Sequence, residues 1–203
     1  EVTLLIRKDR VLSTWERRAS MTLTRELKRR GVNVIARTAV DRVDTGANLG
    51  ATVHYRQGDS DEDRTAYGEV VLAAIGRVPN TDADWFRSSG LKLDERGYVT
   101  VDGYGRTNLD GVWALGDITP GHALAHRAFE QGITIAEKIA GADPKPVIDD
   151  TVPQVVFSFP EAASVGLTLD QAKAREDVVE PKETAYPMLS NARMLMSGEG
   201  GSM

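Results

Sequence analysis

The hydrophobic and polar positions of the first 35 residues predict a strand, a helix and a second strand. Residues 2–6 form an unbroken aliphatic and β-branched run, which is typical of a buried strand. Residues 16–30 mix charged and apolar positions and end at Gly31, which is typical of a helix with a glycine stop. Residues 32–35 are again largely β-branched. This order favours an α/β fold with a parallel sheet.

The rest of the pattern predicts more strands and a second long helix. Residues 70–76 and 111–117 are apolar runs that close on Gly or Gly-Asp, and we expect both to be buried strands. An amphipathic helix is expected over 122–139, and a Pro-containing linker over 141–153 marks a boundary. The shorter expected elements are a half-exposed strand at 51–56, an acidic turn at 58–64, short strands between 91 and 106, strands of a more antiparallel unit at 155–158 and 163–166, and a short helix at 169–175.

Composition and charge exclude several classes of protein. The 203 residues carry 25 Lys and Arg against 30 Asp and Glu, with no basic block, so we expect no nucleic-acid or anionic lipid partner. No apolar run approaches the ~20 residues of a membrane span. The absence of Cys excludes a disulfide scaffold and thiol chemistry in this chain, and three His are too few for a His-rich metal site. We therefore expect a cytoplasmic chain without a metal.

The strongest candidate site is the passage from residues 107–117 into the following helix. Asp117 follows an apolar run and a glycine, where a carboxylate can accept hydrogen bonds from the hydroxyls of a sugar or ribityl chain. Six residues later a helix begins near residues 123–126. Its free N–H groups and positive dipole end suit an electron-rich carbonyl or a developing anion. The alternative interpretation is a buried strand followed by a helix-capping Asp.

Four segments in order resemble the pyridine nucleotide–disulfide oxidoreductases, a family of FAD enzymes that includes dihydrolipoamide dehydrogenase, glutathione reductase and mycothione reductase. Residues 74–81 resemble the turn that closes the family's nicotinamide-nucleotide domain, and residues 107–117 resemble its second flavin motif. Residues 123–132 are similar to the helix whose N-terminus faces the isoalloxazine. Residues 156–166 resemble the opening of the dimerisation domain. The resemblance is collinear over nearly the whole chain.

The resemblance implies an α/β flavoprotein fold with two dinucleotide-binding domains, truncated at both ends, and the start of an α+β dimerisation domain. The corresponding parts are 1–80 for NAD(P) binding, 81–146 for FAD binding and 147–203 for dimerisation. The family's Gly-rich loops, its redox-active Cys pair and its His–Glu pair are expected before Glu1 and beyond Met203. The resemblance therefore assigns no catalytic residue and no metal ligand to this chain, which alone is expected to be inactive.

The resemblance assigns one end of the flavin to each part of the candidate site. Asp117 would bind the ribityl chain of FAD. Reduced flavin is anionic at the N1/O2 edge of its pyrimidine ring, which a helix N-terminus stabilises. The side chain of His126 is expected to be structural, and His54 and His122 are expected at the surface. The backbone groups assigned to the pyrimidine side of the ring are those of Ala123, Leu124, Ala125 and His126.

The end of the first strand bears on the choice of nucleotide. Relatives that prefer NAD carry a carboxylate there, whereas this chain continues with Arg7 and Lys8 and is more similar to the glutathione reductase pattern, whose arginines clamp a 2′-phosphate. Arg10 is a further candidate helper, and a solvated basic turn is the alternative. Val40 and Gly76 are also assigned to the NAD(P) site, Gly76 because a side chain would block close approach of the nucleotide. We expect NADP, or use of both nucleotides.

The resemblance implies an enzyme that passes hydride from NAD(P)H through FAD to a disulfide or a quinone acceptor, as a homodimer. One branch of the family lacks the disulfide centre and reduces quinones, and residues 151–166 and 187–193 are slightly closer to that branch. The alternative is a non-catalytic fragment, or a remnant binding module of the same fold.

Overall fold

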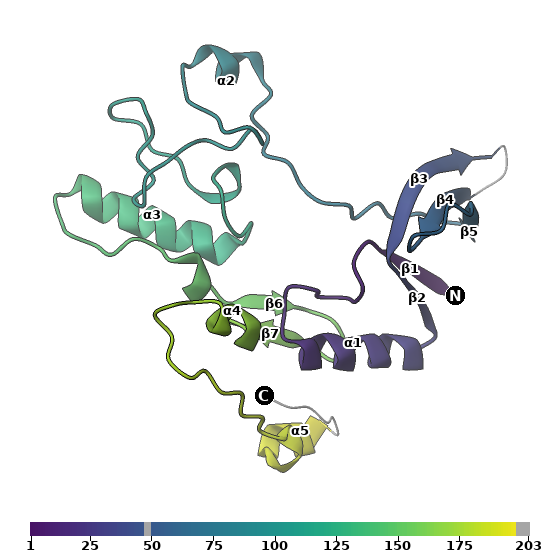
Figure 1. The fold of residues 1–203 in the computed structure, drawn as a ribbon. Coiled ribbons are helices and arrows are strands. Elements are labelled where there is room, and N and C mark those ends of the chain that lie inside the picture. Colours follow the sequence, from purple (N-terminus) through teal and green to yellow (C-terminus); the bar gives the residue numbers. More distant parts are fainter. Residues whose placement is uncertain (47–49, 198–203) are drawn as a thin grey trace. The chain divides into compact units, whose positions relative to one another are not determined.

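The computed structural model describes residues 1–46 and 50–197, which form two compact units (Figure 1). The first unit contains residues 1–73 together with the segment from 155 onward, and the second contains residues 74–154. The division into three domains at residues 80 and 146 stays a prediction. Among the described residues, no helix combines the length and apolar character that a membrane crossing requires.

The first unit opens with the expected strand, helix and strand, but the first strand is not buried as expected: its first two residues are exposed and the other three are half-buried. β1 (Val2–Ile6) runs parallel to β2 (Val32–Ala36), with Ile6 opposite Ala36 at their carboxyl ends. α1 (Arg17–Arg29) connects the two strands and packs against β2 (Figure 1). The run of apolar residues in each strand and the glycine after the helix therefore produce a βαβ unit, as the pattern predicts.

The loop between β1 and α1 is held by its own polar contacts. The buried Ser20 of α1 donates its hydroxyl to the carbonyl of Val11 over 2.5 Å. The guanidinium of Arg10 donates to the carbonyl of Ser13 over 3.0 Å and to the carboxylate of Asp9 over 3.1 Å. Trp15 is buried at the end of the loop. These contacts fix the path of the chain directly after the carboxyl end of β1.

An antiparallel sheet of three strands follows β2. It consists of β3 (Thr38–Thr45), β4 (Ala51–Gln57) and β5 (Arg64–Gly68), in that order, with a register shift between Val40 and Arg42. The strand expected at 51–56 is confirmed, and the acidic segment after it is the connection from β4 to β5. Charged residues with alternating side-chain direction give this sheet one strongly polar face.

The second unit has a small apolar core and one long helix. The core consists of Phe86, Val99 and Ala114, against which Leu91, Val101 and Ile118 pack. Its helical segments are α2 (Asp84–Ser88), the 3₁₀ turns η1 (Gly116–Ile118) and η2 (Asp149–Thr151), and α3 (Ala125–Ile139). The helix expected over 122–139 is therefore confirmed, with its start three residues later than expected.

Two of the expected strands are wrong. Residues 71–80 have no regular structure, and Val70, Leu72 and Ile75 are 87%, 87% and 94% exposed. Residues 111–117 form one isolated bridge, between Trp113 and Arg106, before η1. The expected strands between 91 and 106 are likewise reduced to bridges. An apolar run forms a strand only where a neighbouring strand satisfies its backbone groups, and the described residues provide none here.

The C-terminal segment contains short elements. β6 (Gln154–Val156) pairs with β7 (Ala162–Ser164), and α4 (Leu169–Lys173) begins with a capping box in which Thr168 and Gln171 exchange hydrogen bonds. The N–H of Leu169 also donates to the carboxylate of Glu16 over 2.6 Å, which joins α4 to the start of α1. The last elements are η3 (Met188–Ser190) and α5 (Ala192–Ser197).

Candidate functional site

Asp117 lies on a tight turn that is bonded to α3. Gly116, with φ of 76°, opens the turn, and its carbonyl accepts hydrogen bonds from the N–H and the hydroxyl of Thr119 over 3.0 and 2.8 Å. The N–H of Gly116 donates to the amide oxygen of Gln131 on α3 over 2.8 Å. Asp117 is exposed, and its carboxylate makes no hydrogen bond or ion pair to any residue that the structure describes. The turn thus presents an unpaired carboxylate on a fixed backbone.

The N-terminus of α3 presents unpaired donors. Leu124 is extended, and its carbonyl accepts the N–H of Ala128 over 3.2 Å. No side chain within the described part of the chain caps this end. The N–H groups of Ala125, His126 and Arg127 therefore have no partner inside the helix, and they carry the positive end of its dipole.

Arg127 connects this first helical turn to two other segments. Its side chain is 6% exposed, and its Nε donates to Oδ1 of Asp149 in η2 over 2.6 Å. Its Nη2 donates to the carbonyl of Pro120 over 2.6 Å, and its Nη1 lies 3.5 Å from the hydroxyl of Thr119. Arg127 and Gln131, four residues apart on one face of α3, therefore both hold the segment that carries Asp117.

Two histidines near the same helix end contact the segment that leads into β6. Nε2 of His126 lies 2.7 Å from the carbonyl oxygen of Pro153, and because a carbonyl only accepts, this nitrogen is the donor. Nε2 of His122 lies 3.3 Å from the side-chain amide of Gln154. The contact of His126 is of the kind that a structural role requires. His122 is half-buried and not the free surface residue that was expected.

These groups fit the chemistry of a bound flavin. An unpaired carboxylate accepts hydrogen bonds from the hydroxyls of a ribityl chain, and an uncapped helix N-terminus donates to a carbonyl and favours negative charge on a ring. Gln131, Thr119, Arg127 and Asp149 were not predicted from the sequence. The spacing of Arg127 and Gln131 by one helical turn is a signal that could have suggested a shared partner.

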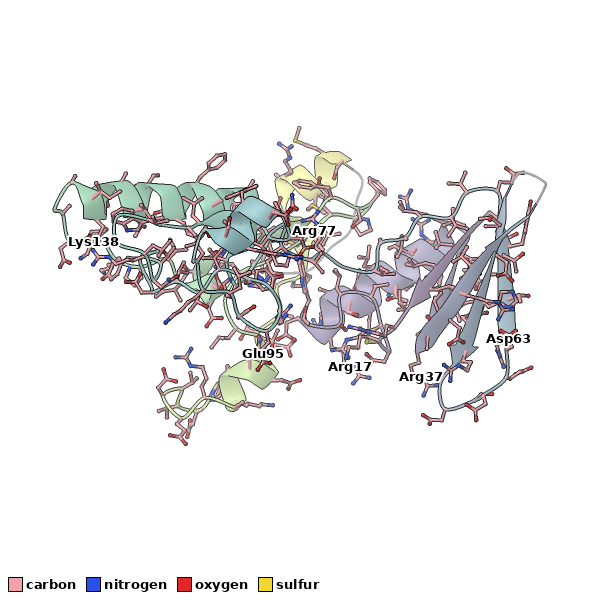
Figure 2. All side chains as sticks on the ribbon, turned by 90° about the horizontal axis from the view of Figure 1, so that it is seen from above. Arg17, Arg37, Asp63, Arg77, Glu95 and Lys138 are labelled. Carbon is pink, nitrogen blue, oxygen red and sulfur yellow. The ribbon has the colours of Figure 1, made fainter. Side chains whose placement is uncertain are left out.

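Three cations lie at the carboxyl edge of the β1–β2 pair. Arg7 and Lys8 follow β1 and are exposed, and Arg37 follows β2 (Figure 2). The N–H of Arg37 donates to the carbonyl of Lys8 over 2.9 Å, which joins the two chain segments. Arg37 was not predicted as a site residue. Arg10, expected as a helper, instead binds the backbone and side chain of its own loop.

Val40 and Gly76 are the other two residues expected at the nucleotide site. Val40 is exposed on β3, at the register shift. Gly76 has φ of 134°, a backbone conformation that favours glycine, but no described atom lies within 4 Å of the position that a side chain would take. Its backbone angle therefore explains the glycine without a close contact.

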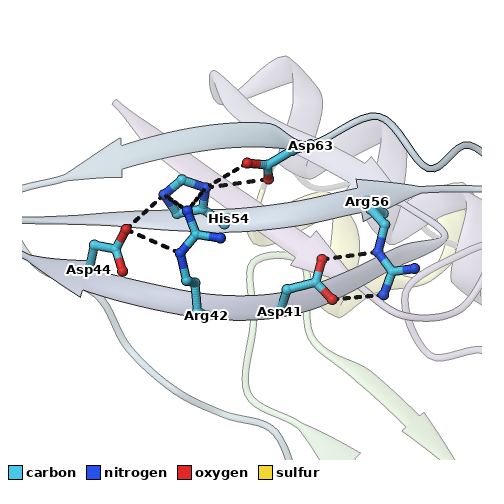
Figure 3. A network of polar contacts seen from close by, with 6 residues as sticks. All are labelled: Asp41, Arg42, Asp44, His54, Arg56 and Asp63. Carbon is cyan, nitrogen blue, oxygen red and sulfur yellow. Dashed lines mark hydrogen bonds and ion pairs between the residues drawn. The ribbon is translucent and has the colours of Figure 1, made fainter.

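The polar face of the three-stranded sheet carries a charged network (Figure 3). The ring nitrogens of His54 lie 3.0 Å from carboxylate oxygens of Asp44 and Asp63, and Arg42 lies against the ring, 3.0 Å from Nδ1. His54 is 12% exposed, so it is not the surface residue that was expected. This network ties β3, β4 and the start of β5 together.

A second ion pair on this face lies between Asp41 and Arg56. Nη2 of Arg56 donates to Oδ1 of Asp41 over 2.7 Å, and Nε donates to Oδ2 over 3.0 Å. This hydrogen bonding holds the pKa of Asp41 below its ordinary value and raises the pKa of Arg56. Within residues 1–46 and 50–197, no group of three His, Cys, Asp or Glu side chains could hold a metal ion.

Comparison with known proteins finds that this chain is similar to members of a flavoprotein family. A family model described as pyridine nucleotide-disulphide oxidoreductase matches residues 1–132. Dihydrolipoyl dehydrogenase from Cupriavidus necator is 36% identical over 199 residues, which are 98% of this chain and 41% of that protein. Dihydrolipoyl dehydrogenase from Geobacillus stearothermophilus is 38% identical over 200 residues, which are 96% of this chain and 40% of that protein.

Two solved structures have the same fold. LpdA from Mycobacterium tuberculosis has a TM-score of 0.85 at 30% identity, over 98% of this chain and 42% of its own. RclA from Escherichia coli, described as an HOCl-induced flavoprotein disulfide reductase, has a TM-score of 0.84 at 25% identity, over 100% of this chain and 45% of its own. The chain therefore has the α/β fold of flavoprotein disulfide reductases, and it spans about two fifths of the length of the curated relatives it matches.

Proposed function

The chain belongs to the pyridine nucleotide-disulphide oxidoreductase family, and we propose that it is part of an FAD-dependent NAD(P)H oxidoreductase. A bound FAD would supply hydride transfer from the nicotinamide nucleotide and electron transfer to a disulfide or quinone acceptor. The observation that carries the proposal is an unpartnered carboxylate, Asp117, on a turn that Gly116 bonds to Gln131 of α3, the helix whose N-terminus is uncapped.

Each group of the site has a defined task in this proposal. Asp117 would accept hydrogen bonds from the ribityl hydroxyls of FAD and so help to hold the cofactor. The backbone of Ala123, Leu124, Ala125 and His126 lies on the pyrimidine side, where the helix dipole favours negative charge on the ring. His126 positions the segment at Pro153 by donating from Nε2, and it transfers no proton.

We propose that NADP, or both nucleotides, bind at the carboxyl edge of β1 and β2. The support is the group of exposed cations there, Arg7, Lys8 and Arg37, which suits the extra charge of a 2′-phosphate. Val40, in the same unit, is included in the proposed nucleotide site, and the assignment of Gly76 stays a separate prediction. Arg10 has no part in it, because its guanidinium is bonded within its own loop.

The names of the relatives favour a disulfide over a quinone as acceptor. They are called dihydrolipoyl dehydrogenase and flavoprotein disulfide reductase. This chain contains no Cys, so any thiol chemistry of the whole protein belongs to residues outside it. We further propose that the whole protein is a homodimer, for which the resemblance of residues 156–166 to the opening of a dimerisation domain is the support, and that it is cytoplasmic.

Titration of the whole protein with FAD, followed by quenching of flavin fluorescence, tests the proposal. We expect the protein to bind FAD, and Asp117→Ala to weaken binding about ten- to a hundredfold, because hydrogen bonds to a charged group contribute about 1.5–3 kcal/mol. Asp110→Ala is the matched control, since Asp110 is also an exposed carboxylate, seven residues earlier and before η1. A protein that binds no FAD, or equal loss in both variants, contradicts the proposed site. FAD binding without oxidation of NADPH or NADH favours a non-catalytic binding module.

A further inference from the structure

We propose that Arg127 is a positioning residue for the flavin site: paired with Asp149, it holds the turn that carries Asp117 against the first turn of α3. The inference rests on the proposed function, because it concerns the same flavin site. Nothing in the sequence pattern singled out either residue, and the two lie 22 positions apart in the chain.

The contacts of Arg127 form a continuous path to the turn. Arg127 donates from Nη2 to the carbonyl of Pro120 over 2.6 Å, and its Nη1 lies 3.5 Å from the hydroxyl of Thr119. That hydroxyl donates in turn to the carbonyl of Gly116 over 2.8 Å, directly before Asp117. Since Arg127 belongs to the first turn of α3, the carboxylate and the helix donors are fixed relative to each other through one side chain.

The backbone at Gly121 allows the guanidinium of Arg127 to approach it closely. Gly121 has φ of 122°, and a Cβ at this position would overlap Nη2 of Arg127 and Oδ2 of Asp149. The guanidinium itself is nearly excluded from solvent, with 6% of the side chain exposed. A buried charge with three polar contacts has one defined position, which is what a positioning residue requires.

The positive charge of Arg127 requires a compensating negative charge at the start of α3. It is the third residue of α3, where the positive end of the helix dipole disfavours a cation. The carboxylate of Asp149, 2.6 Å away, compensates that charge. The pair is neutral as a whole, so the negative charge of a bound ring is favoured by the helix end and not by the guanidinium. Removal of either partner leaves one uncompensated charge, of opposite sign in the two cases.

Because removal of Arg127 and removal of Asp149 leave charges of opposite sign, the two variants are compared in one experiment. Arg127→Met and Asp149→Asn both break the ion pair, and we expect both to weaken FAD binding in a fluorescence titration, by about tenfold for Arg127→Met. Arg127→Lys keeps the charge and should recover part of the affinity. Lys145→Met is the control for loss of an exposed cation in the same unit, and we expect it to bind FAD as the wild type does. Far-ultraviolet circular dichroism shows whether each variant is folded.

The reduction potential of the bound flavin, measured against a reference dye, separates positioning from mere stability. Loss of the positioning contact should make the potential more negative in both variants, because the helix donors no longer lie correctly against the ring. A direct charge effect would instead shift the two variants in opposite directions, since they leave charges of opposite sign. Opposite shifts, or unchanged affinity in a folded Arg127→Met, overturn the inference. If Arg127→Met does not fold, Asp149→Asn and Arg127→Lys decide by the same two measurements. A wild-type protein that binds no FAD overturns the proposed function itself, whereas normal wild-type binding with unaffected variants overturns only this inference.

Discussion

Gly121 shows how one missing side chain can shape the candidate site. Its φ of 122° and the closeness of Arg127 and Asp149 both exclude a Cβ at this position. Gly141, in contrast, has φ of 84° and no described atom within 4 Å of its Cβ position. Both glycines have a backbone angle that an L side chain rarely adopts, and of the two only Gly121 adds steric overlap with the ion pair.

We predict that Gly121→Ala destabilises the protein by about 2 kcal/mol more than Gly141→Ala. Both variants incur the strain of a positive φ, about 1–2 kcal/mol, but only Gly121→Ala displaces the Arg127–Asp149 pair. Urea unfolding of both variants gives the comparison. Equal free energies of unfolding would show that the packing around Gly121 relaxes without cost.

At the edge of β1 and β2, we predict that Arg7→Ala weakens NADPH binding at least tenfold and leaves NADH binding within about twofold. The reason is the loss of a charge-assisted contact to the 2′-phosphate, which NADH lacks. Titration with each nucleotide measures the effect, with Lys28→Ala at the other end of α1 as control. Equal weakening of NADPH and NADH binding would show that Arg7 contributes to the binding of both nucleotides and does not recognise the 2′-phosphate.

Among the elements, α3 and the β3–β4 pair illustrate how charge is placed on regular structure. Along α3, Arg127 and Gln131 share a face because they are one turn apart, and both contact the same turn. Across β3 and β4, the register shift beside Val40 brings Asp41 within hydrogen-bond distance of Arg56. In both cases, the periodicity of the helix or strand determines the face on which a side chain lies. The neighbouring segment determines which group that side chain contacts.

The Asp41–Arg56 pair predicts a pH dependence for the sheet. Because the pKa of Asp41 is lower in the folded protein than in the unfolded chain, the pair stabilises the fold above the unfolded pKa of about 4. That stabilisation is lost as the pH falls through the folded pKa. We expect Asp41→Asn to be less stable than wild type at pH 6, with a smaller difference at pH 3, in urea unfolding. An equal loss of stability in Asp41→Asn at pH 6 and pH 3 would contradict the linkage.

At the scale of the whole molecule, the segment that follows the three-stranded sheet exposes several apolar side chains. Val70, Leu72, Ile75 and Val78 are all at least 84% exposed, and residues 71–80 have no regular structure. Such a segment is a preferred site of proteolysis, since the backbone must be extended and accessible to enter a protease.

We predict that limited trypsin digestion of this chain cuts first after Arg77 and gives fragments 1–77 and 78–203, identified by intact mass. Arg127, with a nearly buried side chain inside a helix, should resist cleavage under the same conditions. Arg77→Gln is the control and should abolish the first cut. Early cleavage elsewhere would show that this segment is protected.

Several features follow from the sequence alone because they depend on local pattern. The β1–α1–β2 order, the long helix after Asp117 and the connection from β4 to β5 are encoded by runs and periods of adjacent residues. The family was also recognisable from four short segments in order, and the match over residues 1–132 confirms it. The assignment of Asp117 and of the α3 backbone to FAD stays a prediction, since it depends on a ligand and not on the pattern.

Tertiary structure decided the features that join distant residues. It turned residues 70–76 and 111–117 into irregular chain, because an apolar run specifies burial but not the strand that must pair with it. The tertiary structure also places His54 between Asp44 and Asp63. It directs the side chain of Arg10 to its own loop and pairs Arg127 with Asp149. Charged side chains have no period that reveals their partners, so only the path of the chain selects which opposite charge or carbonyl lies within hydrogen-bond distance.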